Sequence, residues 1–169
     1  MNSLVIFGSA RSEGNTKKAL EAVLGERNVE VVNLLDKQVA YYSYERTQED
    51  DDFLDIAQKI VGSDIIIFAT PVYWYSMSAQ MKTLFDRLTD LISLRKDLGR
   101  SLKGKTCYLV STGTDEILPT GYEEVFERTA QYFDMQFGGS FYYHVQKGEP
   151  MNEETKHSAQ RFGDKIFSD

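Results

Sequence analysis

Residues 64–71 read DIIIFATP, and this stretch decides the fold of the chain. The five residues from Ile65 to Ala69 are apolar at consecutive positions, without the alternation expected of a strand that has one face in water. Such a run is typical of a strand buried on both faces of a parallel sheet. Pro71 has no backbone N–H and ends the strand. We therefore expect a central strand at residues 64–69.

The rest of the chain alternates between short apolar runs and segments with helical spacing. Further runs predict strands at residues 4–7, 29–32, 106–110 and 135–143. Apolar residues three and four positions apart predict helices at residues 15–24, 53–60, 81–88, 122–129 and 162–166. This alternation predicts an α/β fold: a three-layer, doubly wound, parallel five-stranded sheet of the flavodoxin-like order 2-1-3-4-5.

Length and composition favour one small domain over residues 1–169. The formal net charge of −7 repels nucleic-acid phosphates and anionic lipids, so we expect neither nucleic acid nor a membrane as a partner. The N-terminus has no basic region before its first apolar run, which indicates a cytoplasmic protein. Cys107 is the single cysteine and lies in a predicted strand. A packing role is favoured over a reactive thiol.

The loop after the first strand has the composition of a phosphate-binding loop. Residues 8–16 read GSARSEGNT and combine small residues, hydroxyls and the cation Arg11 at a helix N-terminus. Ala10 stands where a dinucleotide G-x-G-x-x-G loop has its second glycine, and the G-K-[ST] ending of a Walker A loop is missing. The loop therefore favours a monophosphate. The alternative is a plain turn with a helix cap.

The loop after the central strand carries three consecutive aromatic residues. Residues 69–78 read ATPVYWYSMS, which places Tyr73, Trp74 and Tyr75 at the carboxyl edge of the sheet. Flat apolar side chains and free backbone N–H groups suit a planar ring system. The alternative is a core or subunit contact. Ser78 is expected to cap the next helix, with Arg87 on its polar face.

Both loops resemble those of NAD(P)H-dependent FMN reductases and the related iron–sulfur flavoproteins. The first motif is G-S-x-R-x-x-G-N-T, and the second is P-V-Y-(W/F) followed by S-x-x-x-K and F-D-R. The resemblance implies that one group of residues binds the FMN phosphate, a second lies against the isoalloxazine, and a third, after the fourth strand, lines the flavin edge. The residues implied for the phosphate are Ser9, Arg11, Asn15 and Thr16. Those implied for the isoalloxazine are Pro71, Val72, Tyr73, Trp74 and Ser76. Those implied for the flavin edge are Thr112, Gly113 and Thr114.

The third group can equally form only a turn. Iron–sulfur flavoproteins carry a cysteine cluster between the second strand and the second helix. Residues 41–48 of this chain contain no cysteine, so no such cluster is expected.

The acidic run from Glu49 to Asp52 is interpreted as a helix start and not as a metal site. His144 and His157 have no ligand partner at a useful spacing, so no metal is expected. The long segment of residues 36–52 is a candidate for function.

The resemblance implies an enzyme that passes reducing equivalents from NADPH or NADH through FMN to a small acceptor such as a flavin or quinone. The alternative is a flavodoxin-type electron carrier that works with a protein partner. Aromatic surface in excess of what one FMN ring covers predicts a homodimer that helps to enclose the flavin. The residues concerned are Tyr41, Tyr42, Tyr44, Tyr73, Trp74 and Tyr75.

Overall fold

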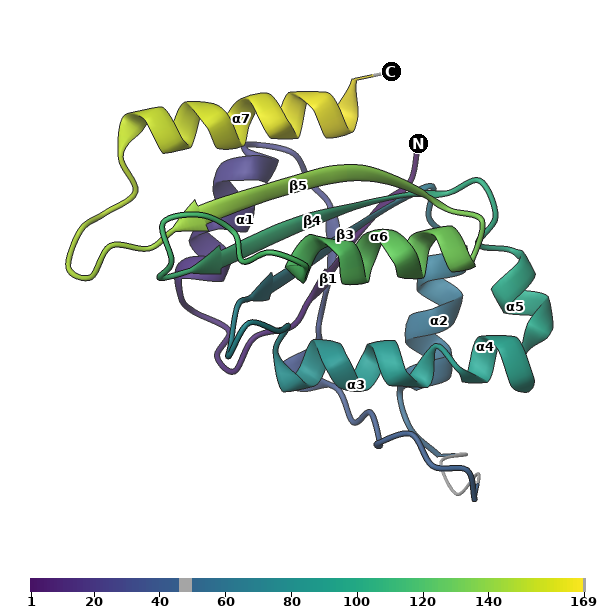
Figure 1. Cartoon of the computed structure of the whole chain (residues 1–169). Helices are drawn as coiled ribbons and strands as arrows, with labels where there is room; N and C mark the ends of the chain where they lie inside the picture. The colour runs from purple at the N-terminus through teal and green to yellow at the C-terminus, as the bar shows by residue number, and fades with distance from the viewer. Residues whose placement is uncertain (46–49, 169) are drawn as a thin grey trace.

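Five parallel strands form a single twisted sheet in the order β2-β1-β3-β4-β5 (Figure 1). The computed structural model describes residues 1–45 and 50–168. The predicted strands and their order are confirmed, and β3 is buried at every position. The strands are β1 (Ser3–Phe7), β2 (Glu30–Asn33), β3 (Ile65–Pro71), β4 (Thr106–Gly113) and β5 (Gln136–His144).

Helices cover both faces of the sheet, as expected of a doubly wound fold. Helices α1 (Asn15–Leu24) and α7 (Glu153–Phe167) share one hydrophobic core, which includes Val23 and Ile166. Helices α2 (Phe53–Val61), α3 (Ala79–Arg87) and α6 (Tyr122–Tyr132) bury their apolar stripes in the second core. Figure 1 shows the two helical layers on opposite sides of the sheet.

The prediction of one helix between β3 and β4 is wrong. Two short helices follow α3, namely α4 (Asp90–Ser93) and α5 (Lys96–Arg100), and a 3-10 turn, η1 (Leu34–Asp36), follows β2. The reversal between α4 and α5 depends on Gly99. A Cβ atom there would lie 2.2 Å from the backbone oxygen of Leu91, so only glycine permits this approach.

The register brings the ends of three strands to the same edge of the sheet. Phe7 of β1 pairs with Ala69 of β3, and Pro71 of β3 pairs with Thr112 of β4. The Gly8 N–H donates to the Ala69 carbonyl at 2.9 Å, which continues the ladder into the first loop. The loops after β1, β3 and β4 therefore leave the sheet side by side.

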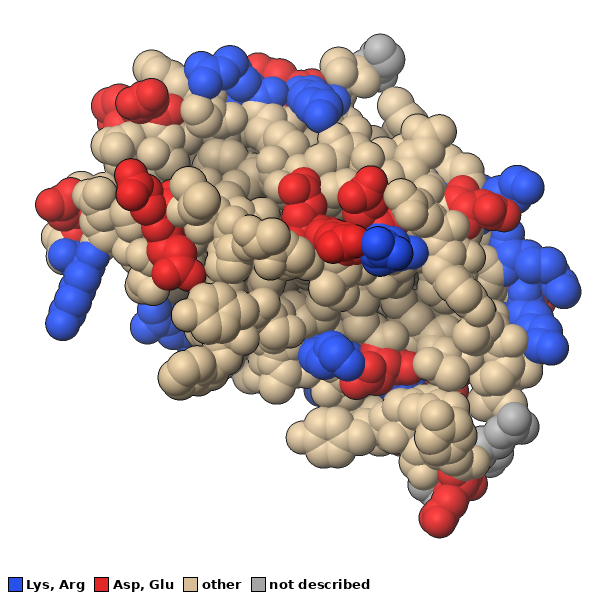
Figure 2. Space-filling view, in the orientation of Figure 1, with Lys and Arg blue, Asp and Glu red and all other residues tan. Residues whose placement is uncertain are grey.

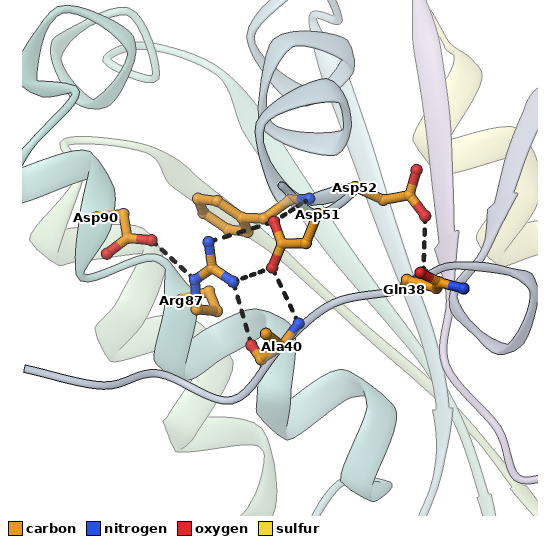
Figure 3. A network of polar contacts seen from close by, with 7 residues as sticks. Gln38, Ala40, Asp51, Asp52, Arg87 and Asp90 are labelled. Atoms are coloured by element: carbon orange, nitrogen blue, oxygen red, sulfur yellow. Dashed lines mark hydrogen bonds and ion pairs between the residues drawn. The ribbon is translucent and has the colours of Figure 1, made fainter. Parts of the chain in front are cut away.

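Arg87 of α3 holds the segment between η1 and α2 against the helix. This residue was expected on the polar face of α3, but it is only 3% exposed. Its guanidinium pairs with Asp51 and, at 2.8 Å, with Asp90, and it donates to the Ala40 carbonyl at 3.1 Å (Figure 3). The same group lies over the Phe53 ring, 4.5 Å from its centroid. Sequence periodicity did not reveal this role because the partners come from a distant segment.

The acidic run before α2 has two roles, one of which was predicted. Asp51 accepts from the Phe53 N–H at 3.0 Å at the start of the helix, as a helix-start residue would. It also accepts from the Ala40 N–H and pairs with Arg87, whereas Asp52 accepts from the Gln38 N–H at 2.7 Å. Glu49 lies outside the described residues. The run therefore fixes the preceding segment as well as starting the helix.

The charge state of Asp51 follows from these contacts. Burial raises the pKa of the carboxyl, but the bonds from Arg87 and from two backbone N–H groups outweigh it and hold the pKa below its ordinary value of 3.8. A lowered folded-state pKa gives stability that is present above the unfolded-state pKa and is lost as the pH falls through the folded-state value. The contribution of Asp51 to the free energy of unfolding is therefore constant around neutral pH and is lost only in strong acid.

We expect Asp51→Ala to lower the free energy of unfolding by about 3 kcal/mol at pH 7, because it leaves the buried Arg87 without its main counter-charge. Urea unfolding followed by circular dichroism measures the loss. Asp86→Ala is the matched control, since Asp86 forms an exposed pair with Lys82 on the same helix and should change stability by about 0.5 kcal/mol or less. Equal effects of the two substitutions would contradict this role of Arg87.

Candidate functional site

A cavity of about 510 Å³ lies at the carboxyl edge of the sheet, where the three loops meet. Eleven of the twelve predicted site residues line it, and Ser76 does not. Val145, directly after β5, lines it as well and was not predicted from the sequence. The lining residues are Ser9, Arg11, Asn15, Thr16, Pro71, Val72, Tyr73, Trp74, Thr112, Gly113, Thr114 and Val145.

The loop after β1 is held from two neighbouring elements. The Ser78 hydroxyl donates to the Gly8 carbonyl at 2.7 Å and accepts from the Met81 N–H at 3.3 Å, which confirms Ser78 as the cap of α3. The Asn33 amide, at the end of β2, donates to the Ser12 hydroxyl at 2.9 Å. The loop backbone is thus fixed independently of any ligand.

Arg11 is exposed and lies over Gly14. A Cβ at position 14 would be 2.7 Å from the Arg11 Nε, so glycine lets the guanidinium rest against the loop. In the described part of the chain, no hydrogen bond or ion pair engages the Arg11 side chain. A cation with no protein partner, at the mouth of a cavity, is suited to closing over an anion.

The N-terminus of α1 faces the same cavity through Asn15 and Thr16. Its N-cap, Gly14, has no side chain to satisfy the first N–H groups of the helix, so these donors are open to a ligand. Uncapped N–H groups together with the positive end of the helix dipole form a favourable phosphate site. The Thr16 hydroxyl lies 2.9 Å from the Thr112 hydroxyl, and this bond joins the phosphate-type loop to the end of β4.

The aromatic residues are presented by a tight and strained turn. Tyr73 and Ser76 exchange two backbone hydrogen bonds, of 2.8 and 3.0 Å, around Trp74 and Tyr75. Both central residues have positive φ, 49° and 62°, a conformation that favours Asn and Gly. Trp74 is 94% exposed and Tyr75 is 71% exposed. Tyr73 and Ser76 close this turn together, and of the two only Tyr73 lines the cavity.

The loop after β4 brings backbone close to the cavity. Val72 N–H donates to the Thr112 carbonyl and Val145 N–H to the Gly113 carbonyl, both at 2.7 Å, so the sheet ladder continues to the cavity wall. A Cβ at Gly113 would lie 2.6 Å from the Tyr142 Oη, so only glycine leaves room for this ring. Burial and the nearby Asp115 carboxylate raise the pKa of Tyr142, whose hydroxyl remains a neutral donor to the Asp115 carbonyl at 2.8 Å.

Three findings concern the described chain outside the cavity. Cys107 is buried, and burial raises the pKa of its thiol to about 12, which agrees with a packing role. Within residues 1–45 and 50–168, the acidic, histidine and cysteine side chains form no group of three that could hold a metal ion. The helices in that part of the chain are all too short or too polar to cross a membrane.

This fold and cavity define a flavodoxin-like α/β protein with a cavity at the topological switch point of its sheet. The solved structure of the Trp repressor binding protein from Bacillus subtilis agrees, with a TM-score of 0.77, 25% identity and coverage of 99% of this chain and 98% of that one. The chain belongs to the NADPH-dependent FMN reductase family, whose model matches residues 1–149.

Two curated relatives support the family. The protein YwqN of Bacillus subtilis strain 168, whose name describes an NAD(P)H-dependent FMN-containing oxidoreductase, is 28% identical over 151 residues, 82% of each chain. An iron–sulfur flavoprotein of Archaeoglobus fulgidus is 34% identical over 100 residues. That match covers 52% of this chain and 46% of the relative, so the chain spans about half its length.

We expect Ser78→Ala to lower the free energy of unfolding by about 1–2 kcal/mol, because it removes the cap of α3 and the bond to the Gly8 carbonyl together. Chemical denaturation provides the measurement. Ser76→Ala, two residues away and exposed, should change stability by less than about 0.5 kcal/mol. If Ser78→Ala were as harmless as its control, the loop would not depend on this hydroxyl.

Proposed function

We propose that this chain is an FMN-dependent oxidoreductase that takes reducing equivalents from NADPH or NADH and passes them to a small acceptor such as a flavin or quinone. The observation that carries the proposal is the convergence of a phosphate-type loop and an aromatic turn on one cavity in a member of this family. FMN supplies the redox chemistry, since its ring accepts a hydride and releases two electrons to the next molecule that stacks on it.

The cavity residues fit FMN in charge and shape. The open N–H groups at the start of α1 and the free Arg11 guanidinium supply donors for a phosphate dianion. Pro71, Val72 and Gly113 line the cavity and supply apolar surface for a planar ring. In this proposal the protein orients the ring and leaves one face open to the nicotinamide and then to the acceptor.

Anaerobic mixing of the FMN-loaded protein with NADPH or NADH tests the function. We expect full loss of the flavin absorbance with at least one of the two nucleotides, and its return when a quinone is added. The two-electron balance is one nicotinamide oxidised for each quinone reduced to the hydroquinone. If neither nucleotide bleached the flavin, whereas a one-electron donor did, the electron-carrier alternative would replace the proposal.

We expect Arg11→Ala to weaken FMN binding by about 1.5–3 kcal/mol, the contribution of a hydrogen bond to a charged group. The free energy of unfolding without FMN should not change, because Arg11 is exposed and without a partner among the described residues. Fluorescence titration with FMN gives the affinity. Lys18→Ala removes an exposed cation from α1 away from the cavity, so it should leave the affinity unchanged.

We propose further that the aromatic turn contacts a second copy of the chain. Trp74, Tyr75 and Tyr44 are each more than two-thirds exposed, and Trp74 lines the cavity, so a partner packed there would also cover the cofactor site. Exposed aromatic clusters are enriched at the centres of subunit interfaces. The strained backbone of the turn supports the same reading, because local strain of this kind concentrates at functional sites.

The double variant Trp74→Asn, Tyr75→Gly tests the dimer without distorting the turn, since Asn-Gly is the preferred pair for this backbone geometry. We expect light scattering to give a dimer mass for the parent protein and a monomer mass for the variant. The variant monomer should remain folded, because Asn and Gly adopt the backbone of this turn without strain. A parent protein that is already monomeric at micromolar concentration would contradict the proposal.

A further inference from the structure

A second hollow lies far from the cavity, between α4, α5 and the end of α6. Two adjoining cavities of about 270 and 450 Å³ share Ile92, Tyr132 and Phe133 as lining residues. Together we call them the α5 groove. Ile92 is 40% exposed and Tyr132 is 69% exposed, although both are large and apolar or aromatic. Exposed apolar surface in a hollow is a usual mark of an interaction site.

The charge around the α5 groove is opposite to that of the whole chain. Residues 95–105 contain five Lys or Arg residues and one acidic residue, Asp97, in a chain with a net charge of −7. Lys96, Arg100 and Lys103 line the groove itself, together with one acidic residue, Asp134. Figure 2 shows basic side chains gathered at the right-hand edge, where Figure 1 places α5.

These cations are poorly matched by protein acids. In the described part of the chain, no hydrogen bond or ion pair engages the side chain of Lys96 or Arg100. Lys103 reaches Asp134 only at 3.7 Å, with both side chains more than two-thirds exposed. Arg95, in contrast, is paired with Asp97 at 2.8 Å. The groove therefore has unpaired positive charge beside its apolar floor.

We propose that the α5 groove binds an acidic amphipathic segment of another protein. Apolar side chains of that segment would pack on Ile92 and Tyr132, and its carboxylates would face Lys96, Arg100 and Lys103. Recognition of this kind, with a helix laid in a groove, uses apolar anchors at i, i+3, i+4 and i+7. The site lies at the end of the sheet opposite the cofactor cavity, so its occupation leaves that cavity open (Figure 1).

The charge distribution favours a protein segment over a nucleic acid or a membrane. An extended polyanion or an anionic lipid surface would also meet the acidic remainder of the molecule and be repelled there. A short segment touches only the basic groove, and it supplies apolar side chains for the floor. The net negative charge of the rest of the chain then disfavours binding of the same segment elsewhere on the molecule.

The test uses a fluorescein-labelled helical peptide of Glu, Ala and Leu with all its Leu residues on one face, and fluorescence anisotropy with the full-length protein. We expect saturable micromolar binding that weakens at least about tenfold when Lys96, Arg100 and Lys103 are all changed to Glu. The matched control changes Lys18, Lys147 and Arg161 to Glu, which alters the net charge equally on other faces. FMN affinity and the unfolding midpoint serve as checks that both variants fold.

Further measurements distinguish the proposed peptide site from a purely electrostatic site, a nucleic-acid or membrane site and a subunit contact. A scrambled peptide of the same composition, without an apolar face, should bind at least about tenfold more weakly, and so should the parent peptide with the variant Ile92→Ser, Tyr132→Ser. The proposal is overturned by an absence of peptide binding, by equal effects of the two charge reversals, or by tighter binding of oligo-dT or phosphatidylserine vesicles. It is also overturned if Ile92→Ser, Tyr132→Ser converts a dimer to a monomer, since the groove would then be a subunit contact.

Discussion

The geometry of the cavity at the carboxyl edge of the sheet depends on one buried hydroxyl, that of Ser78. It accepts from the Met81 N–H and donates to the Gly8 carbonyl, so it joins the start of α3 to the loop after β1. The Thr70 hydroxyl, 3.2 Å away at the end of β3, completes the junction. Two loops that are far apart in sequence are thereby fixed at the same place, and a buried hydroxyl with all its bonds made resists movement. The site is consequently built before a ligand arrives.

The sequence predicted what depends on local pattern and missed what depends on distant partners. The apolar run from Ile65 to Ala69 identified the central strand because burial on both faces leaves its mark on consecutive residues. Resemblance to family motifs named twelve candidate residues in three loops, and eleven of them line one cavity because parallel strands end at the same edge of the sheet. Arg87 was placed on a polar face because its partner Asp51 comes from a segment whose path periodicity does not determine. Val145 was missed because only the loops after three strands were searched.

The turn at Trp74 and Tyr75 is the clearest case in which local preference is overridden. Large side chains at positive φ are unfavourable by about 1–3 kcal/mol each, and the surrounding ladder must hold them there. A stable fold alone would favour Asn and Gly at these positions. The aromatic residues therefore serve something other than the stability of the isolated chain, and Trp74, which lines the cavity, connects that requirement to the edge of the sheet where the three loops meet.

The distribution of charge separates the two ends of the molecule. With a net charge of −7, the long-range field opposes any approaching anion, so the proposed binding of a phosphate at the cavity requires short-range donors. Arg11 and the uncapped N–H groups of α1 act within a few ångströms, where salt screens little, whereas the opposing field decays over about 8 Å at physiological ionic strength. At the α5 groove, Lys96 and Arg100 have no acidic partner among the described residues, so attraction of an acidic segment there would be a contact between exposed charges, which salt screens. Binding at the two ends should therefore respond to ionic strength in opposite directions.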